Sequence, residues 1–94
     1  MITSAQIRAA RSLIGLSQGQ VAQTTGLSIP TVKRAESEKD APVSRAAVDA
    51  IRNALENAGV IFIAEDAEGA GVRLRKSRQA GGLRPEELNA ANDD

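Results

Sequence analysis

Apolar residues recur at helical spacing through the first part of the chain. Ile7, Ala10 and Ile14 repeat every three or four positions, so they lie on one face of a helix. Ser4 is a suitable N-cap for this segment, and Gly15 is a residue at which a helix commonly ends. The pattern therefore predicts a first helix from Ser4 to about Ile14.

Two shorter helices are predicted next. Ser17 has the character of an N-cap, and Gln20 stands three residues later as its capping-box partner. Gly26 is suited to end this second helix in a left-handed conformation. Ser28 then caps a third helix, in whose first turn the missing N–H of Pro30 does no harm.

The longest helix is predicted from about Arg45 to Ala58, with Ser44 before it and Gly59 after it. Its apolar residues form a stripe at spacings of three and four. The members of this stripe are Ala47, Val48, Ile51, Ala54 and Leu55. The segment from Ser37 to Pro42 has the composition of a loop.

The pattern then changes to that of strands. Val60 to Ile63 is apolar on both faces, and Val72 to Arg75 alternates strictly with a period of two. Between them, Glu65 to Gly71 is an acidic, glycine-containing turn, whose closely spaced acids are typical of a solvated loop rather than a cation site. A β-hairpin is therefore predicted over 60–76.

The last segment, 77–94, is rich in Gly, Gln, Asn and acids, and we expect a mobile tail in which a short helix over 83–92 frays. The net charge of the 94-residue chain is zero. Residues 1–78 carry eleven basic and eight acidic side chains, whereas 79–94 carry one basic and four acidic ones. The predicted organisation is thus a mildly basic body with an acidic tail.

Composition excludes several kinds of chemistry. The chain has no cysteine and no histidine, so disulfides, thiolate zinc sites and histidine-based catalytic triads are excluded. We therefore expect that the protein is not an enzyme and that it has no catalytic residue, bound metal or cofactor. The chain has neither an apolar run of about 18 residues nor the pattern of a signal peptide, so we expect a soluble, cytoplasmic protein without a membrane partner.

The second and third predicted helices meet the steric demands of two helices that cross over a tight turn. Ala22 is small where the third helix crosses the second, and Gly26 tolerates the positive φ of the turn. Leu27 supplies an apolar residue after the glycine, and Val32 and Ala35 give the third helix an inward face. These requirements together predict a helix-turn-helix.

The same stretch resembles the phage-repressor (Xre-like) helix-turn-helix family over roughly residues 4–58. The matching residues are Leu16-Ser17-Gln18, Val21-Ala22, Gly26-Leu27-Ser28, Thr31-Val32 and Glu36. The chain is also similar to a small subgroup that ends in two strands, matched here by Ala58-Gly59-Val60, Phe62-Ile63 and Gly71 to Lys76. The wider family often has a fifth helix there.

The resemblance implies a mainly α fold with a DNA-binding domain over 1–59, a hairpin over 60–76 and a tail over 77–94. The implied recognition helix, Ser28–Ser37, enters the major groove of DNA. The implied contacts are base edges for Ser28, Ile29 and Pro30, phosphates for Thr31 and Lys33, guanine for Arg34, and a phosphate contact or a brace for Gln18.

The apolar and the basic residues of the implied recognition helix differ in what they indicate. Ile29 and Pro30 offer only apolar contacts, for example to thymine methyl groups, which predicts a half-site that contains A·T pairs. Lys33 and Arg34 taken without the motif would be an ordinary solvated helix face.

The hairpin is the predicted dimerisation element. One face of its first strand can cover the fourth helix, whereas the other face would lie in water in a monomer. A homodimer formed through the hairpin removes this exposure, and the alternative is that Ile61 and Ile63 pack under the tail of the same chain. The predicted interface consists of Val60, Ile61, Phe62, Ile63, Val72 and Leu74. Such a dimer would read a palindrome with half-sites about 34 Å apart.

The resemblance thus implies a transcriptional regulator that binds DNA as a homodimer and represses by occluding a promoter. The residues after the helix-turn-helix are too few for a sensor domain, so control would come through protein level or a regulatory protein partner. One alternative is a DNA-binding antitoxin whose tail, 77–94, covers a toxin. Another is a protein-interaction module without DNA, which zero net charge and the apolar Ile29 and Pro30 favour.

Overall fold

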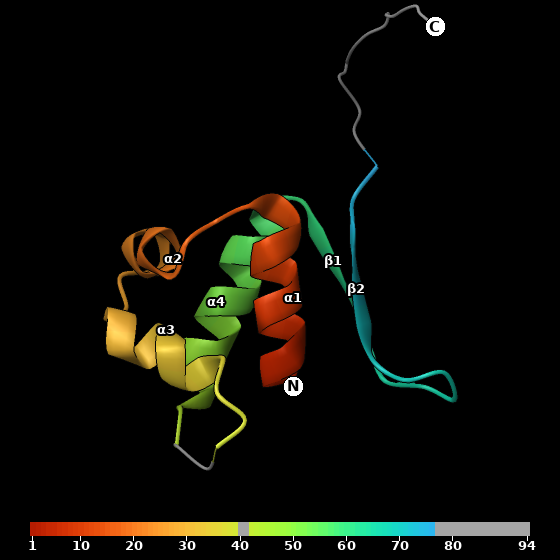
Figure 1. Ribbon diagram of the computed structural model, residues 1–94, viewed down its shortest axis with the longest axis horizontal. Coiled ribbons are helices and arrows are strands. Elements are labelled where there is room, and N and C mark those ends of the chain that lie inside the picture. Colours follow the sequence, from red (N-terminus) through yellow and green to blue (C-terminus); the bar gives the residue numbers. More distant parts are fainter. Residues whose placement is uncertain (40–41, 77–94) are drawn as a thin grey trace, which may run out of the picture.

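The structure, a computed structural model, describes residues 1–39 and 42–76. These residues form four helices followed by a two-stranded antiparallel hairpin (Figure 1). The elements are α1 (Ser4–Ile14), α2 (Gln18–Thr25), α3 (Ile29–Ala35), α4 (Arg45–Asn57), β1 (Val60–Ile63) and β2 (Gly71–Leu74). The prediction of a mainly α fold with a hairpin is confirmed. No helix in this part of the chain is both long and apolar enough to cross a membrane.

The predicted tail, 77–94, and the short helix expected within it lie outside the described residues. The third helix is shorter than the predicted Ser28–Ser37: it ends at Ala35, and Glu36 forms its C-cap. The fourth ends at Asn57, one residue before the predicted end.

Most predicted helix ends are confirmed. The Ser17 hydroxyl accepts a hydrogen bond from the Gln20 N–H, and the Gln20 side chain accepts one from the Ser17 N–H. Ser28 and Ser44 cap α3 and α4 by one bond each: their hydroxyls accept from the N–H groups of Thr31 and Ala47. Gly26 ends α2 with a φ of 76°, a conformation that favours glycine.

The start of α1 corrects the sequence prediction, because Thr3 rather than Ser4 is its N-cap. The Thr3 hydroxyl accepts from the Gln6 N–H at 3.1 Å, and the Gln6 Oε1 accepts from the Thr3 N–H at 2.8 Å. Ser4 has Ile7 at the position where a capping box requires a polar side chain, so only a cap at Thr3 closes both bonds.

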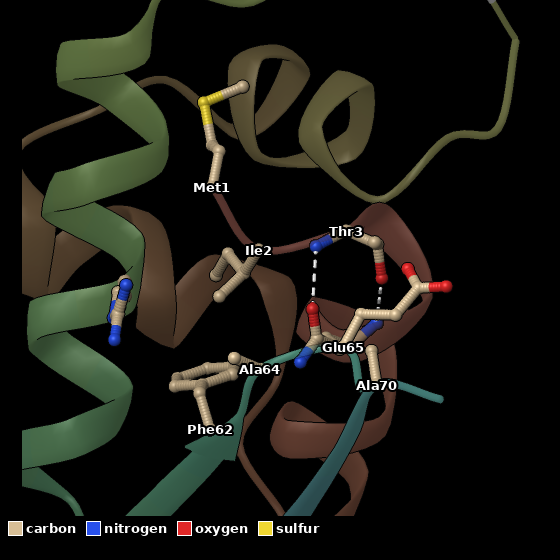
Figure 2. Close-up of a pocket in the computed structure, with 9 residues that line it drawn as sticks. Met1, Ile2, Thr3, Phe62, Ala64, Glu65 and Ala70 are labelled. Carbon is tan, nitrogen blue, oxygen red and sulfur yellow. Dashed lines mark hydrogen bonds between the residues drawn. The ribbon is translucent and has the colours of Figure 1, made fainter. Parts of the chain in front are cut away.

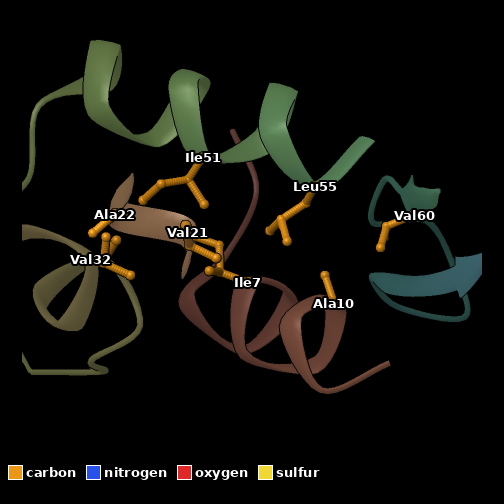
Figure 3. Packing of buried hydrophobic residues seen from close by; sticks show 9 residues of the cluster. Ile7, Ala10, Val21, Ala22, Val32, Ile51, Leu55 and Val60 are labelled. Atoms are coloured by element: carbon orange, nitrogen blue, oxygen red, sulfur yellow. The ribbon is translucent and has the colours of Figure 1, made fainter. Parts of the chain in front are cut away.

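The core is built from aliphatic side chains of all four helices and the first residue of β1 (Figure 3). Its buried members are Ile7, Ala10, Val21, Ala22, Val32, Ala35, Ile51, Leu55 and Val60. Ala54, predicted to face inward, is only partly buried at the edge of α4. The largest side chains that are fully buried are aliphatic, each contributing about 1.5–3 kcal/mol by its burial.

The hairpin packs against α1 and α4, on the opposite side of the molecule from α2 and α3 (Figure 1). Its register pairs Val60 with Leu74 and Phe62 with Val72, and this face contacts the core. The other face carries Ile61 and Ile63, which are half-buried. The outer surface of α3 and the outer surface of the hairpin therefore lie on opposite sides of the molecule.

Gln6 fixes the hairpin to the start of α1. Its Nε2 donates hydrogen bonds to the carbonyl oxygens of Ile63 and Gly71, both at 3.0 Å. These two residues form the last pair of the hairpin before its loop. Because the Gln6 side chain is buried and its Oε1 already bonds to Thr3, both ends of the amide are satisfied.

Candidate nucleic-acid interface

The helix α3 buries one face and exposes the other. Val32 and Ala35 lie in the core, held there by packing against α2 and α4. The outer face carries six of the seven residues to which the sequence assigned DNA contacts. Ser28, Ile29, Pro30, Lys33 and Arg34 are exposed, and Thr31 is partly exposed. The structure therefore brings these six side chains together on one accessible surface.

Three polar side chains form a row along this outer face. The Ser28 Oγ lies 2.8 Å from the Thr31 Oγ1, and the Arg34 Nη2 donates to the same Thr31 oxygen at 3.2 Å. These residues are three positions apart, which places them one above the other on a helix. The row holds the Arg34 guanidinium along the surface of α3, and within residues 1–39 and 42–76 its other N–H donors make no hydrogen bond.

Ile29 links the starts of α2 and α3. Its Cδ1 lies 3.9 Å from the position that a Cβ would take at Gly19, in the first turn of α2. The residue nevertheless remains 46% exposed. Half of an isoleucine side chain is therefore available for apolar contact beside the polar row.

A buried carboxylate ties three helices together behind this surface. Glu36, at the end of α3, is 4% exposed and accepts from the Arg11 Nε at 2.7 Å and the Arg11 Nη2 at 3.1 Å. The Gln18 Nε2 donates to the same carboxylate at 3.1 Å. Arg11 also donates to the Leu16 carbonyl at 3.0 Å. The network connects α1, the first turn of α2 and the end of α3.

The electrostatics of this pair favour the charged state of the arginine. The hydrogen bond to Glu36 raises the pKa of the Arg11 guanidinium; burial opposes this, and the negative charge of Glu36 adds to the increase. The guanidinium is therefore charged at every pH at which the protein is handled.

The network also decides how Gln18 is used in the free chain. The sequence left two roles open, a phosphate contact and a brace, and the side chain is bound to Glu36 as a brace. Sequence reasoning matched Glu36 to a motif but missed Arg11, and it missed Arg8, which donates to the Glu36 carbonyl and to the Glu38 carboxylate. One signal was present: Glu36 follows Val32 by four positions, so an acid stands on the inward face.

The six residues predicted for the dimer interface separate into two groups. Val60 is fully buried, and Phe62 and Val72 pack against the same core, so their side chains are already used within the chain. Ile61 and Ile63 are half-buried on the opposite face of the hairpin. Leu74 is 52% exposed, although it lies across from Val60.

A separate hollow lies between the chain start, α4 and the hairpin (Figure 2). Arg52 lies 5.9 Å from the centre of the Phe62 ring and also contacts Glu56, with 3.2 Å between Nε and Oε2. The hollow is lined by Met1, Ile2, Thr3, Gln6, Arg52, Phe62, Ala64, Glu65 and Ala70. Among the residues that the structure describes, no group of three histidine, cysteine, aspartate or glutamate side chains could hold a metal ion.

Comparison of the sequence with protein-family models gives no match, and neither does comparison with curated proteins.

Proposed function

We propose that this chain is a sequence-specific DNA-binding transcriptional regulator of the Xre-like type. In this proposal α2 and α3 form a helix-turn-helix, α3 enters the major groove, and occupation of a promoter represses transcription. The observation that carries the proposal is the exposed row of Ser28, Thr31 and Arg34 on α3, held in place by the buried Glu36 behind it.

The charge of α3 supports this assignment. Its exposed face carries Lys33 and Arg34, and the helix itself contains no acid. The neighbouring Glu36 points inward, where Arg11 neutralises it. A face of this kind attracts the phosphate backbone, which supplies most of the sequence-independent affinity of DNA-binding proteins.

The chemistry of the side chains supplies sequence reading. Arg34 can exchange its weak contact with Thr31 for a bidentate contact to guanine O6 and N7, which discriminates between bases by about 1–3 kcal/mol. Ile29 and Pro30 can contact thymine methyl groups. Ser28 and Thr31 have hydroxyls that bond either a base edge or a phosphate.

A single copy would read too little DNA. Specific sites are typically bound about 4–10 kcal/mol more tightly than non-specific DNA, and α3 has only seven residues. We therefore include a homodimer in the proposal, with two copies of α3 on the two halves of a palindrome.

The proposal is tested by selecting bound fragments from random duplex DNA and then measuring affinity for the selected site. Arg34→Ala is expected to lose discrimination at one base pair by about 1–3 kcal/mol, whereas Lys33→Ala weakens all sequences evenly and reduces the salt dependence. Arg52→Ala is the control, because it removes the same charge beside Phe62, next to the hairpin. Failure to enrich any fragment, or equal effects of Arg34→Ala and Arg52→Ala, would contradict the proposal.

A further inference from the structure

The two ends of the hairpin carry opposite charges. The loop from Ala64 to Ala70 contains Glu65, Asp66 and Glu68 and no basic residue. The other end carries Arg73, Arg75 and Lys76 and no acid. All six side chains are exposed, and none takes part in an ion pair within residues 1–39 and 42–76.

The outer edge of β2 has backbone groups that point away from the hairpin. The Arg75 N–H donates to the Gly59 carbonyl, and backbone groups in an antiparallel pair alternate in direction along the strand. The backbone N–H and C=O groups of Arg73 and Gly71 therefore point toward β1, as those of Arg75 do. The N–H and C=O groups of Val72 and Leu74 point outward, which makes this edge able to pair with another strand.

The same edge has a protruding side chain and a groove of small residues. Leu74 is 52% exposed on the side of the sheet that faces the core. Close by, between α1 and β2, lies a mostly apolar groove whose lining includes Ala5, Ala9, Ala70 and Val72. A protrusion and a groove on one surface suit a two-fold contact, in which each copy fills the groove of the other.

We propose that two copies of this chain pair antiparallel through their β2 strands, about a two-fold axis at Val72. With Val72 opposite its own copy, Leu74 lies opposite Ala70 of the second copy, at the groove. Arg73 of one copy lies opposite Gly71 of the second copy. Because glycine has no side chain, the stem of this arginine can cover the half-buried Ile63 of the second copy, which pairs with Gly71.

This register also matches the charges of the hairpin. It brings Arg75 and Lys76 of each copy beside the acidic loop of the other, so opposite charges meet at two symmetric places. A register centred one residue later would place Arg73 directly opposite Arg73 of the second copy, which like-charge repulsion disfavours.

The inference deepens the proposed function and rests on it for its purpose, which is to place two α3 helices on one palindrome. The hairpin lies on the opposite side of the molecule from α3 (Figure 1). Pairing at β2 therefore leaves both α3 surfaces free to contact DNA.

Two charge-reversed variants test the arrangement in the full chain. Glu65→Lys/Glu68→Lys makes both ends of the hairpin basic, and Arg75→Glu/Lys76→Glu makes both ends acidic. Each variant alone is expected to dimerise about tenfold or more weakly than wild type, because two contacts change from attraction to repulsion. An equimolar mixture is expected to form heterodimers, because both contacts are then attractive again.

Sedimentation without DNA at tens of micromolar gives the oligomeric state, and circular dichroism checks the fold. Leu74→Asp is expected to be monomeric, whereas Ile29→Asp, of similar exposure but on α3, is expected to remain dimeric. The variant Lys33→Glu/Arg34→Glu is expected to keep the dimer and lose DNA binding, so failure of the proposed function is distinguishable from failure of this inference.

Three results would overturn the inference. One is a wild type that is monomeric. If such a chain dimerises once 77–94 are removed, the tail rather than a second copy occupies the edge of β2. Another is normal dimerisation by both charge-reversed variants. The third is a mixture of the two that stays monomeric.

Discussion

Replacement of the buried Glu36 carboxylate by an amide tests how strongly the helices depend on it. In Glu36→Gln one oxygen still accepts a hydrogen bond, but the new NH₂ group faces a donor of Arg11 or Gln18. The variant loses a charge-assisted bond, worth about 1.5–3 kcal/mol. It also leaves a guanidinium without its counter-charge.

Removing one partner of a fully buried ion pair costs about 3–5 kcal/mol. Arg11 is 24% exposed and reaches water, so the value here is lower. We expect the free energy of unfolding to fall by about 2–4 kcal/mol, a large part of the about 5–15 kcal/mol that stabilises a typical domain.

The matched control is Glu38→Gln, two residues away. Glu38 pairs with Arg8, but the two side chains are 70% and 40% exposed, so this pair contributes about 0–1 kcal/mol. Urea unfolding of both variants, followed by circular dichroism at one protein concentration, measures the difference. A difference below about 1 kcal/mol between the variants would refute the reasoning.

The pH dependence of this difference has a definite sign. Because the hydrogen bond to Glu36 raises the pKa of Arg11, the contribution of the arginine is present below its ordinary pKa and is lost only when the pH rises through the higher folded value. The gap between wild type and Glu36→Gln is therefore expected to stay constant in mildly alkaline buffers. A gap that closes there would contradict the assignment of the charge to Arg11.

Two further predictions concern the core and the tail. Ile51→Ala removes a fully buried side chain from the middle of the core, so the free energy of unfolding, measured by urea unfolding, should fall by about 2–5 kcal/mol. The control is Ala46→Gly on the exposed face of the same helix, which should cost about 1 kcal/mol. Deletion of 79–94 removes a segment of net negative charge that repels phosphate, so the shortened chain should fold and bind DNA with equal or slightly higher affinity; loss of the circular dichroism signal or of DNA binding would contradict this.

The sequence predicted the features that depend on neighbouring residues. Ser17, Ser28 and Gly26 act within one helical turn, so a local pattern was sufficient to place them. The cap of α1 was assigned one residue too late, because Ser4 and Thr3 are both good caps and only the position of Gln6 distinguishes them.

Most features that the sequence could not predict depend on residues far apart in the chain. Arg11 and Glu36 are separated by 25 positions, and nothing near Arg11 indicates its partner. The candidate DNA surface was predicted from a motif, but the row formed by Thr31 and Arg34 depends on which rotamers the packed helix allows. In the hairpin, the sequence predicted that one face of β1 covers α4, but the apolar pattern did not show how deeply Val60 is buried, so Val60 was still assigned to the dimer interface.

The bonds from Gln6 to the hairpin have a consequence for the order in which the chain folds. The partners of its amide lie 57 and 65 positions later, so during synthesis these bonds cannot close until the hairpin has left the ribosome. The helical part, whose contacts are more local, can assemble earlier. We expect bonds of this sequence separation to form after the folding transition state, so that Gln6→Ala raises the unfolding rate and leaves the folding rate nearly unchanged in stopped-flow measurements. The side chain that fixes the hairpin to α1 is thus synthesised early and completes its hydrogen bonds only after Gly71 has been made.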